Sequence, residues 1–404
     1  MRDILFVIDS LTYGGAEKSL VSLLNNMDFS KYRVDILLFK REGELERLLP
    51  ENVNILAVPK YFIFTNEKIN IIKHKNIKFL AYRISTSLKL RMNNKSKNKL
   101  HSEQVIYSSV RNVLPMVQKK YDVAIAYSQG FPTYFVVEKV KAIKKLAWIN
   151  CDYVKTMYDK EFDNKYYKKM DNIIVVSEYI YESMKRMKYN YKEKLKVILD
   201  IIDPNFIKRM SLLECPKDFN CKELKILTVG RLVWVKGYDI AVQAAKLLKE
   251  SGYKFKWYVI GEGNERKKIE ELISQYKLDD CFILLGSRMN PYVYMDKADI
   301  YVQTSRKEGF GLSVIEAKIL KKLIVCTNFE TAKELIKDNY DGQIVNINPF
   351  SIAEGIKEYI DNDIKVKKVE HILNTNCIYS TVNEINKLYE IIADDEVKYE
   401  KNLC

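Results

Sequence analysis

Short apolar runs alternate with amphipathic, helix-like stretches along the first half of the chain. The run at residues 4–8 is followed by a helical pattern through about Leu24, and more runs of strand length follow. This alternation predicts a parallel sheet with helices on both faces, and ligands bind such sheets at the carboxyl ends of the strands. The other predicted strands of this half are residues 34–39, 53–58, 121–127, 145–149, 172–176 and 196–199.

The same alternation begins again near Leu224. Strands are predicted at residues 224–231, 255–260, 281–285, 299–302 and 323–326, with helices at 238–249 and from Asn264. A chain of 404 residues exceeds one ordinary hydrophobic core, so two α/β domains are expected, each with a doubly wound parallel sheet. We assign them to residues 1–204 and 224–375. Residues 205–223 have little apolar periodicity and read as a linker, and residues 376–404 contain a final amphipathic helix from 377 to about 392.

Composition narrows the class of protein. The chain is 47% hydrophobic, has no run of about 18 apolar residues, and opens directly on a strand, which predicts neither a signal peptide nor a membrane span. Its seven cysteines are an odd number without paired spacing, as expected of a reduced, cytoplasmic protein. Only three histidines are present, so we expect no metal site.

The net charge of +14 is concentrated in one segment. Residues 68–120 contain thirteen lysines and arginines and one acidic residue, Glu103, and so carry +12 of the total. Leu80, Ile84 and Leu88 recur there every four residues, on one face of a predicted helix. A membrane-surface helix, a nucleic-acid patch and a solvated basic face all fit this pattern. Basic residues near an anionic leaflet contribute roughly 1 kcal/mol each, and nucleic-acid motifs are absent elsewhere. We therefore favour the membrane surface and expect no nucleic acid.

A glycine-bearing loop joins the predicted strand at 299–302 to a helical pattern that begins near Leu312. A loop of this kind leaves backbone N–H groups free at the helix N-terminus, where they can bind a phosphate. Glu316 is predicted one turn inside the helix, where a carboxylate can accept hydrogen bonds from the vicinal hydroxyls of a ribose. Glu308, in the loop, can do the same for a sugar. The full string runs from Ser305 to Lys318 and reads SRKEGFGLSVIEAK.

A second pair of candidate residues follows the strand at 224–231. Arg231 and Lys236 lie in the string GRLVWVKG, which begins at Gly230. Two cations at a strand end can neutralise the charge that develops on a leaving diphosphate without a metal ion.

The two glutamates, eight positions apart within EGFGLSVIEA, resemble the E-x7-E signature of retaining GT-B glycosyltransferases, most closely those of family 4. The resemblance covers nearly the full length and implies a GT-B fold, with two Rossmann-like domains facing a cleft. It implies that Glu316 holds the nucleotide ribose, Glu308 contacts the donor sugar, and Arg231 and Lys236 bind the diphosphate. The implied loop ligands of the diphosphate are Gly309, Phe310, Gly311, Leu312 and Ser313.

Other motifs match the same family. Gly14 and Gly15 match a G-G-A-E string that faces the donor diphosphate, Gly261 matches a G-x-G in the donor pocket, and Arg288 is expected near the nucleobase. The final helix is expected to cross back to the first domain.

One motif departs from the family pattern. Where many members have W-x-H-x-D, this chain has Trp148, Asn150 and Asp152, so asparagine replaces a histidine that contacts the transferred sugar. We assign Asn150 to the catalytic group and Trp148 and Asp152 to the acceptor side. Asparagine forms hydrogen bonds but carries no proton. The family is thought to use front-face attack, with the leaving phosphate taking the acceptor proton, so the mechanism stands while the donor sugar becomes uncertain.

These features predict a retaining, metal-independent glycosyltransferase that needs no cofactor. We expect a nucleotide-sugar donor, with UDP the commonest base in the family, and a lipid-linked saccharide acceptor in the assembly of a polysaccharide such as a capsule, an exopolysaccharide or a teichoic acid. The basic segment then places the enzyme on an anionic membrane surface, at the cytoplasmic face of the plasma membrane. Two alternatives remain: a protein or soluble acceptor, and a non-catalytic GT-B scaffold that binds membrane or nucleic acid.

Overall fold

The chain divides into two compact units in the computed structural model. Unit 1 comprises Met1–Ile201 and Thr381–Cys404, and unit 2 comprises Ile202–Ser380. The structure describes residues 1–12, 14–41, 43, 45–66, 77–96, 99–213, 217–219, 221–288, 290–375 and 379–393. Since unit 2 begins at Ile202, the predicted end of the first domain, at residue 204, lies three residues inside unit 2.

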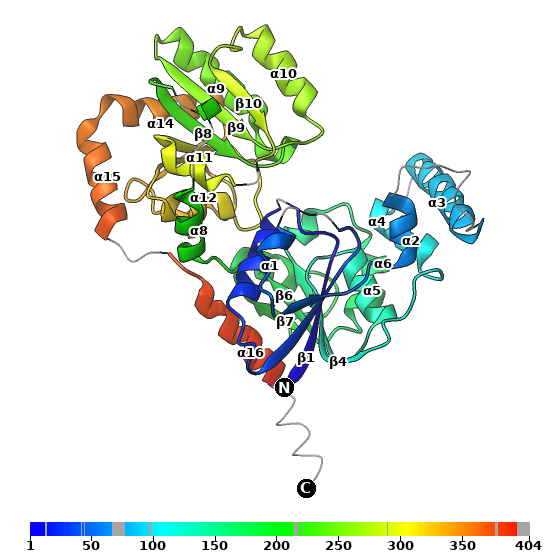
Figure 1. The fold of residues 1–404 in the computed structure, drawn as a ribbon. Coiled ribbons are helices and arrows are strands. Elements are labelled where there is room, and N and C mark those ends of the chain that lie inside the picture. Colours follow the sequence, from blue (N-terminus) through cyan, green and yellow to red (C-terminus); the bar gives the residue numbers. More distant parts are fainter. Residues whose placement is uncertain are drawn as a thin grey trace. The chain divides into compact units, whose positions relative to one another are not determined.

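Unit 1 is built on a parallel sheet (Figure 1). Its described strands follow the order β3-β2-β1-β4-β5-β6-β7, and each pair of neighbours is parallel. Its apolar runs form the core, since Leu5, Phe6 and Val7 of the central strand β1 are fully buried. The strands are β1 (Arg2–Ile8), β2 (Tyr32–Leu38), β3 (Val53–Ile55), β4 (Lys120–Ala126), β5 (Lys141–Ile149), β6 (Asn172–Val175) and β7 (Leu195–Val197).

Helices connect these strands, and the last described helix, α16 (Ile385–Ala393), also belongs to unit 1. Tyr389 of α16 stacks on Tyr32 with ring centroids 5.1 Å apart, and Lys144 Nζ donates to the Ile391 carbonyl at 2.7 Å. The start predicted for this helix, at residues 377 and 378, lies outside the described residues. The other helices are α1 (Gly15–Asn25), α2 (Lys60–Asn66), α3 (Ile77–Lys95), α4 (Ser102–Val110), α5 (Phe131–Lys139), α6 (Lys160–Tyr167) and α7 (Glu178–Lys185), with 3-10 turns η1 (Glu46–Leu48), η2 (Tyr153–Lys155) and η5 (Val382–Glu384).

Unit 2 repeats the parallel architecture with a different strand order, β10-β9-β8-β11-β12-β13 among the described residues. The strands are β8 (Leu224–Val229), β9 (Phe255–Ile260), β10 (Phe282–Gly286), β11 (Ile300–Gln303), β12 (Leu323–Thr327) and β13 (Gln343–Val345). The helices are α8 (Pro204–Ser211), α9 (Tyr238–Glu250), α10 (Arg266–Gln275), α11 (Tyr292–Lys297), α12 (Leu312–Ile319), α13 (Ala332–Leu335), α14 (Pro349–Asp361) and α15 (Asp363–Thr375), with η3 (Lys217–Phe219) and η4 (Trp234–Lys236).

The segment predicted as a linker, residues 205–223, is part of unit 2. Helix α8 begins there, with Pro204 in its first turn and the Asp203 side chain accepting from the backbone N–H of Asn205 and Phe206. It packs against α11, and the Asn290 side chain donates to the Met210 carbonyl at 2.7 Å. Residues 214–216 and 220 of the segment lie outside the described residues. These contacts show that α8 is folded against unit 2, which the weak periodicity of the segment did not predict.

The basic segment contains α3 and α4, which pack against each other, and α3 also contacts α2. Of this segment, residues 68–76, 97 and 98 lie outside the described residues. In the part of the chain that the structure describes, none of the helices combines the length and apolar character needed to cross a bilayer.

Candidate active site

The glycine-bearing loop in unit 2 runs from β11 into α12, which begins at Leu312 as predicted. Gly311 caps this helix with φ +90°, and a Cβ atom there would meet Leu335 Cδ1 at 2.6 Å. The positive φ therefore favours glycine, and any other residue would in addition push the Leu335 side chain aside. In the first turn of α12 the Val314 N–H donates to the Gly311 carbonyl at 3.0 Å, whereas the Leu312 and Ser313 N–H groups have no backbone acceptor among the described residues. Two such N–H groups at a helix N-terminus favour an anion.

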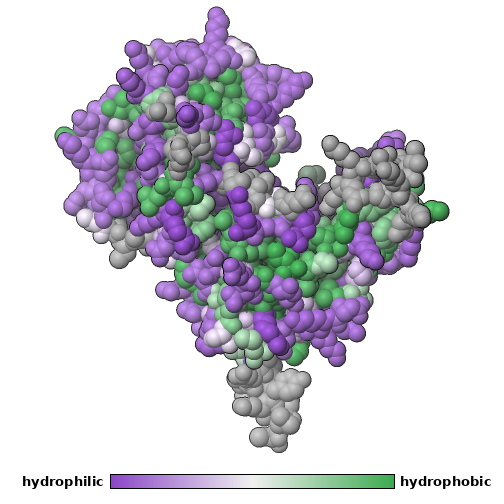
Figure 2. Space-filling view, in the orientation of Figure 1, coloured by the Kyte–Doolittle hydropathy of each residue, from purple (hydrophilic) through white to green (hydrophobic). Residues whose placement is uncertain are grey.

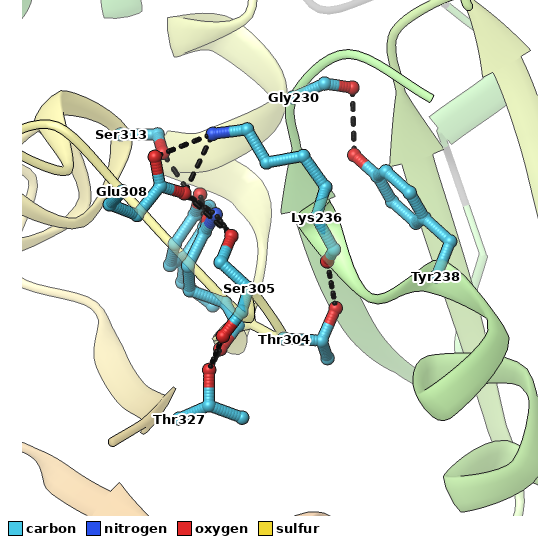
Figure 3. Close-up of polar contacts among 10 residues, drawn as sticks. Gly230, Lys236, Tyr238, Thr304, Ser305, Glu308, Ser313 and Thr327 are labelled. Carbon is cyan, nitrogen blue, oxygen red and sulfur yellow. Dashed lines mark hydrogen bonds and ion pairs between the residues drawn. The ribbon is translucent and has the colours of Figure 1, made fainter. Parts of the chain in front are cut away.

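An ion pair joins two of the predicted residues. Lys236 Nζ, at the end of η4, lies 2.6 and 2.7 Å from the two carboxylate oxygens of Glu308 (Figure 3). The side chains are 17% and 8% exposed. The two loops are also joined by the Thr304 hydroxyl, which donates to the Lys236 carbonyl at 2.9 Å. The structure thus brings the predicted phosphate-binding cation together with the predicted sugar-binding carboxylate.

Two residues that the sequence analysis did not assign to the site complete this pair. The Gln303 side-chain N–H donates to Glu308 Oε1 at 2.8 Å, and the Ser305 hydroxyl donates to the same oxygen at 2.5 Å. Gln303 is 1% exposed and Ser305 is fully buried. Their signal in the sequence is a pair of polar residues at the carboxyl end of a buried strand, next to the glycine-bearing loop. Glu308 therefore has both cationic and neutral donors.

Glu316 lies in α12, as predicted, and is 4% exposed. The Tyr292 hydroxyl, at the start of α11, donates to Glu316 Oε1 at 2.8 Å. Burial, and then the Glu316 charge, raises the pKa of Tyr292, so this hydroxyl keeps its proton and acts as a donor. The contact fixes the orientation of the Glu316 carboxylate.

Three predicted residues follow the ends of neighbouring strands β8 and β9. Gly261 has φ +151°, and a Cβ atom there would meet the Gly230 carbonyl oxygen at 1.9 Å, so these strand ends approach as only glycine allows. The same carbonyl accepts from the Tyr238 hydroxyl at 2.7 Å. Arg231 is exposed, and its guanidinium makes no hydrogen bond or ion pair with any residue that the structure describes. It is open to a ligand.

Arg288, predicted near the nucleobase, is held by other side chains of unit 2. Its Nε donates to the Tyr294 hydroxyl at 2.9 Å, and its Nη2 donates to Asp218 Oδ2 at 2.8 Å. This ion pair ties η3 to the end of β10. A contact with the nucleobase stays a prediction.

The remaining predicted residues belong to unit 1. Gly14 caps α1, which begins at Gly15. Asn150 follows β5, and its Nδ2 donates to the Tyr127 carbonyl at 2.9 Å. Its Oδ1 is buried and has no partner among the described residues, so it can accept a hydrogen bond. One acceptor of Asn150 is therefore unused, and a contact with the transferred sugar stays a prediction.

Trp148 and Asp152 have structural contacts that their sequence motif does not reveal. Trp148 is fully buried and stacks on Tyr127 with ring centroids 4.5 Å apart, so we revise its role from acceptor contact to core packing behind the strand end. Asp152 pairs with Lys155 at 3.0 Å and accepts from the Tyr179 hydroxyl at 3.2 Å. An acceptor-side role for Asp152 stays a prediction.

Among the residues described here, no group of three or more His, Cys, Asp and Glu side chains is placed to hold a metal ion.

Comparison with known proteins places these residues in a family. Residues 216–375 match the family model for glycosyl transferases, group 1. This part of the chain is similar to a group 1 glycosyltransferase domain. It contains Arg231, Lys236, Glu308 and Glu316.

The names of two curated relatives of this domain state that they act on poly(ribitol-phosphate) and on a sugar linked to diphospho-undecaprenol. The chain is 28% identical over 187 residues to the poly(ribitol-phosphate) alpha-N-acetylglucosaminyltransferase of Staphylococcus aureus, covering 45% of this chain and 37% of that protein. It is 31% identical over 178 residues to the N-acetylgalactosamine-N,N'-diacetylbacillosaminyl-diphospho-undecaprenol 4-alpha-N-acetylgalactosaminyltransferase of Campylobacter jejuni, covering 44% and 47%. The chain thus spans less than half the length of these two relatives.

Solved structures extend the likeness to both units. A variant of S. aureus TarM, in complex with fondaparinux, alpha-GlcNAc-glycerol and UDP, has a TM-score of 0.68 at 18% identity and covers 97% of this chain and 100% of its own. Anabaena Alr3699/HepE, in complex with UDP and glucose, also has a TM-score of 0.68, at 17% identity with the same coverage. The chain that carries the glycosyltransferase domain has the GT-B fold.

Proposed function

We propose that this protein is a retaining glycosyltransferase of family 4 that moves a sugar from a UDP-sugar to a lipid-linked saccharide in the assembly of a surface polysaccharide. The observation that carries the proposal is the Lys236–Glu308 pair, at 2.6 Å, beside the N-terminus of α12. A cation, a sugar-binding carboxylate and free helix amides are the groups that a nucleotide sugar needs. The UDP in both neighbouring structures and the acceptors named for the relatives support the choice of donor and acceptor.

In this proposal the donor diphosphate lies on Arg231, Lys236 and the first turn of α12. Arg231 is already open, whereas Lys236 moves from Glu308 to the phosphate, or contacts both. The two cations stabilise the charge on the leaving diphosphate, and the reaction needs no metal ion. As in front-face attack, the leaving phosphate oxygen takes the proton of the acceptor hydroxyl, and Asn150, which carries no proton, takes no part in this transfer.

A thermal-shift panel with UDP, GDP, ADP and CMP tests the nucleotide site. A ligand at about 100 times its dissociation constant should stabilise the protein by roughly 2.7 kcal/mol. We expect this shift with UDP, and we expect Glu316→Ala to lose most of it because the ribose loses its acceptor. Lys297→Ala, an exposed cation at the end of α11, is the control and should keep the shift. A wild-type protein that responds to none of the four nucleotides would contradict the proposal.

The membrane part of the proposal rests on α3. Its exposed apolar side chains are Ile77, Ile84, Leu88 and Met92, at 81%, 54%, 53% and 70% exposure, spaced seven, four and four residues apart on one helix face. Leu80, which was predicted on this face, is half-buried. The helix has five basic residues and no acidic one, which matches an anionic lipid surface. Figure 2 shows hydrophobic surface beside hydrophilic surface in this part of unit 1.

Vesicle flotation tests this face. Ile84→Ser and Leu88→Ser together should lower binding to vesicles of phosphatidylcholine and phosphatidylglycerol by about tenfold or more, because each exposed side chain contributes about 1 kcal/mol or more when buried in lipid. Arg91→Gln with Lys95→Gln should weaken binding in a salt-dependent way. Ile364→Ser, at a position 82% exposed in unit 2, is the matched control and should have no effect. Unchanged binding of the α3 variants would refute the membrane role of this helix.

The unpaired cysteines support a cytoplasmic location, at the inner face of the plasma membrane. Cys221, Cys281 and Cys326 form no disulfide among the residues that the structure describes, as is usual in a reducing compartment.

A further inference from the structure

Gln303, the last residue of β11, contacts the Lys236–Glu308 pair through Glu308. Both the nitrogen and the oxygen of its side-chain amide form hydrogen bonds. The Nε2 group donates to Glu308 Oε1 and to Ser305 Oγ, both at 2.8 Å. The Oε1 atom accepts from the Tyr301 hydroxyl at 2.6 Å and from the Ser313 hydroxyl at 3.3 Å. With 1% exposure, Gln303 has no room for water in place of these partners. A buried amide with four partners has one stable orientation.

The proton order along this chain of hydrogen bonds follows from its two ends. Glu308, as a carboxylate, only accepts, so the amide N–H groups of Gln303 are turned to Glu308 and the amide oxygen to Tyr301. Tyr301 is fully buried, and burial raises the pKa of its hydroxyl well above the usual value, so the hydroxyl keeps its proton and donates it to this oxygen. Each donor in the chain thus points towards Glu308.

The arrangement also joins two parts of the proposed donor site. Ser313 lies in the first turn of α12, where the diphosphate is proposed to bind, and Glu308 is the proposed sugar contact. Gln303 contacts both side chains. When a diphosphate draws Lys236 away, Gln303 and Ser305 are the donors that still hold the Glu308 carboxylate.

We propose that Gln303 is a positioning residue for sugar transfer, which holds the Glu308 carboxylate in its reactive orientation and couples it to the first turn of α12. This inference rests on the proposed function. It predicts that Gln303 affects turnover much more than donor binding, because the amide touches Glu308 and no part of the donor.

Gln303→Glu tests the inference, since it keeps the shape of the side chain and replaces the N–H donor by an acceptor. Two carboxylates then lie in hydrogen-bond contact and repel unless they share a proton. At pH 8 we expect kcat to fall about 100-fold, with the donor KM changed by less than about fivefold. Activity should return as the pH falls towards 6, because the shared proton restores a donor to Glu308. Gln303→Leu, which cannot take up a proton, should lose activity at every pH.

The assay is nucleotide release with water as the acceptor. It uses whichever of UDP-glucose, UDP-N-acetylglucosamine, UDP-galactose, UDP-N-acetylgalactosamine and GDP-mannose the wild type turns over fastest. Gln343→Glu is the matched control, because Gln343 is also a buried strand glutamine, 4% exposed. It lies in β13, which β12 separates from β11, and its side chain donates to the Gly355 carbonyl of α14. Its activity should show no recovery at low pH.

The outcomes separate the two proposals. A wild type that turns over none of the five donors overturns the proposed function and this inference with it. An active wild type with an unchanged kcat and pH profile in Gln303→Glu overturns the positioning role alone. If Gln303→Glu does not fold, Tyr301→Phe decides, because it removes the hydrogen bond that orients the amide. About a tenfold loss of kcat in that variant supports the role, and an unchanged kcat refutes it.

Discussion

Replacing Lys236 by methionine should reduce turnover about 10²–10³-fold, the usual loss when one preorganised donor to a developing charge is removed. The Lys236 side chain is 17% exposed, so its charge acts in a partly water-excluded site. Methionine keeps most of the length and apolar contact of the side chain. The loss should appear in kcat as well as in kcat/KM, because the charge on the diphosphate grows as the glycosidic bond breaks. Steady-state kinetics with the nucleotide sugar that the wild type turns over fastest measures this loss.

A structural explanation of that loss can be separated from a catalytic one. Removing the cation leaves Glu308, 8% exposed, with only its neutral donors, and breaking a buried pair costs about 3 kcal/mol. Lys236→Met should therefore also lower the melting temperature. The double variant Lys236→Met with Glu308→Gln removes the uncompensated charge and should recover most of the stability but none of the turnover. Recovered turnover in the double variant would show that the loss was structural.

The strands of both units could be predicted well because each is a short apolar run bounded by polar residues. The exception is β13, which is three residues long and begins with the polar Gln343, so it has no apolar run to detect. Helix α8 was missed for a different reason. Its pattern is weak, although the capping aspartate Asp203 and the first-turn Pro204 are both ordinary start signals for a helix.

The candidate site could be predicted as a set of residues but not as a set of contacts. Motif spacing pointed to Lys236 and Glu308, which are far apart in sequence, but nothing in the sequence says that they pair with each other. Gln303 was missed because the predicted strand ended at Val302 and a glutamine is ordinary at a strand end. The W-x-H-x-D motif predicts an acceptor-side role for Trp148, because another residue of the motif contacts a sugar in the family. The structure buries Trp148, since a strand inside a sheet that is covered on both faces buries its large side chains. Burial and pairing depend on the tertiary structure, and motif spacing does not encode them.

Asp200→Asn should stabilise unit 1 at pH 8, because it removes a buried negative charge. Asp200 is 4% exposed, and one of its carboxylate oxygens has no hydrogen-bond partner among the described residues. Burial raises the pKa of Asp200 to about 7, the Glu17 charge adds to this, and a hydrogen bond from Ser19 opposes it. The ordinary value is 3.8, so ionised Asp200 is costly in the folded protein.

The sign of the pH dependence follows from that raised pKa. Between pH 3.8 and about 7 the folded protein binds a proton at Asp200 that the unfolded chain has lost, so stability falls as the pH rises through this window. A shift of about three pKa units corresponds to about 4 kcal/mol. The buried amide of asparagine offsets part of this, which leaves a net gain of about 2 kcal/mol at pH 8 and almost none near pH 4. Melting temperatures of both proteins across this range give the difference directly.

Asp163→Asn is the matched control for Asp200→Asn, because Asp163 is also buried in unit 1 but is fully provided with donors. It accepts hydrogen bonds from Tyr134 and Tyr153, each at 2.5 Å, and from Gln104 at 2.7 Å. An amide there turns an N–H group towards a donor, so Asp163→Asn should destabilise the protein by about 2 kcal/mol. Equal effects of the two substitutions would contradict the argument, since it is the number of donors, and not burial alone, that decides whether a buried carboxylate stabilises the fold.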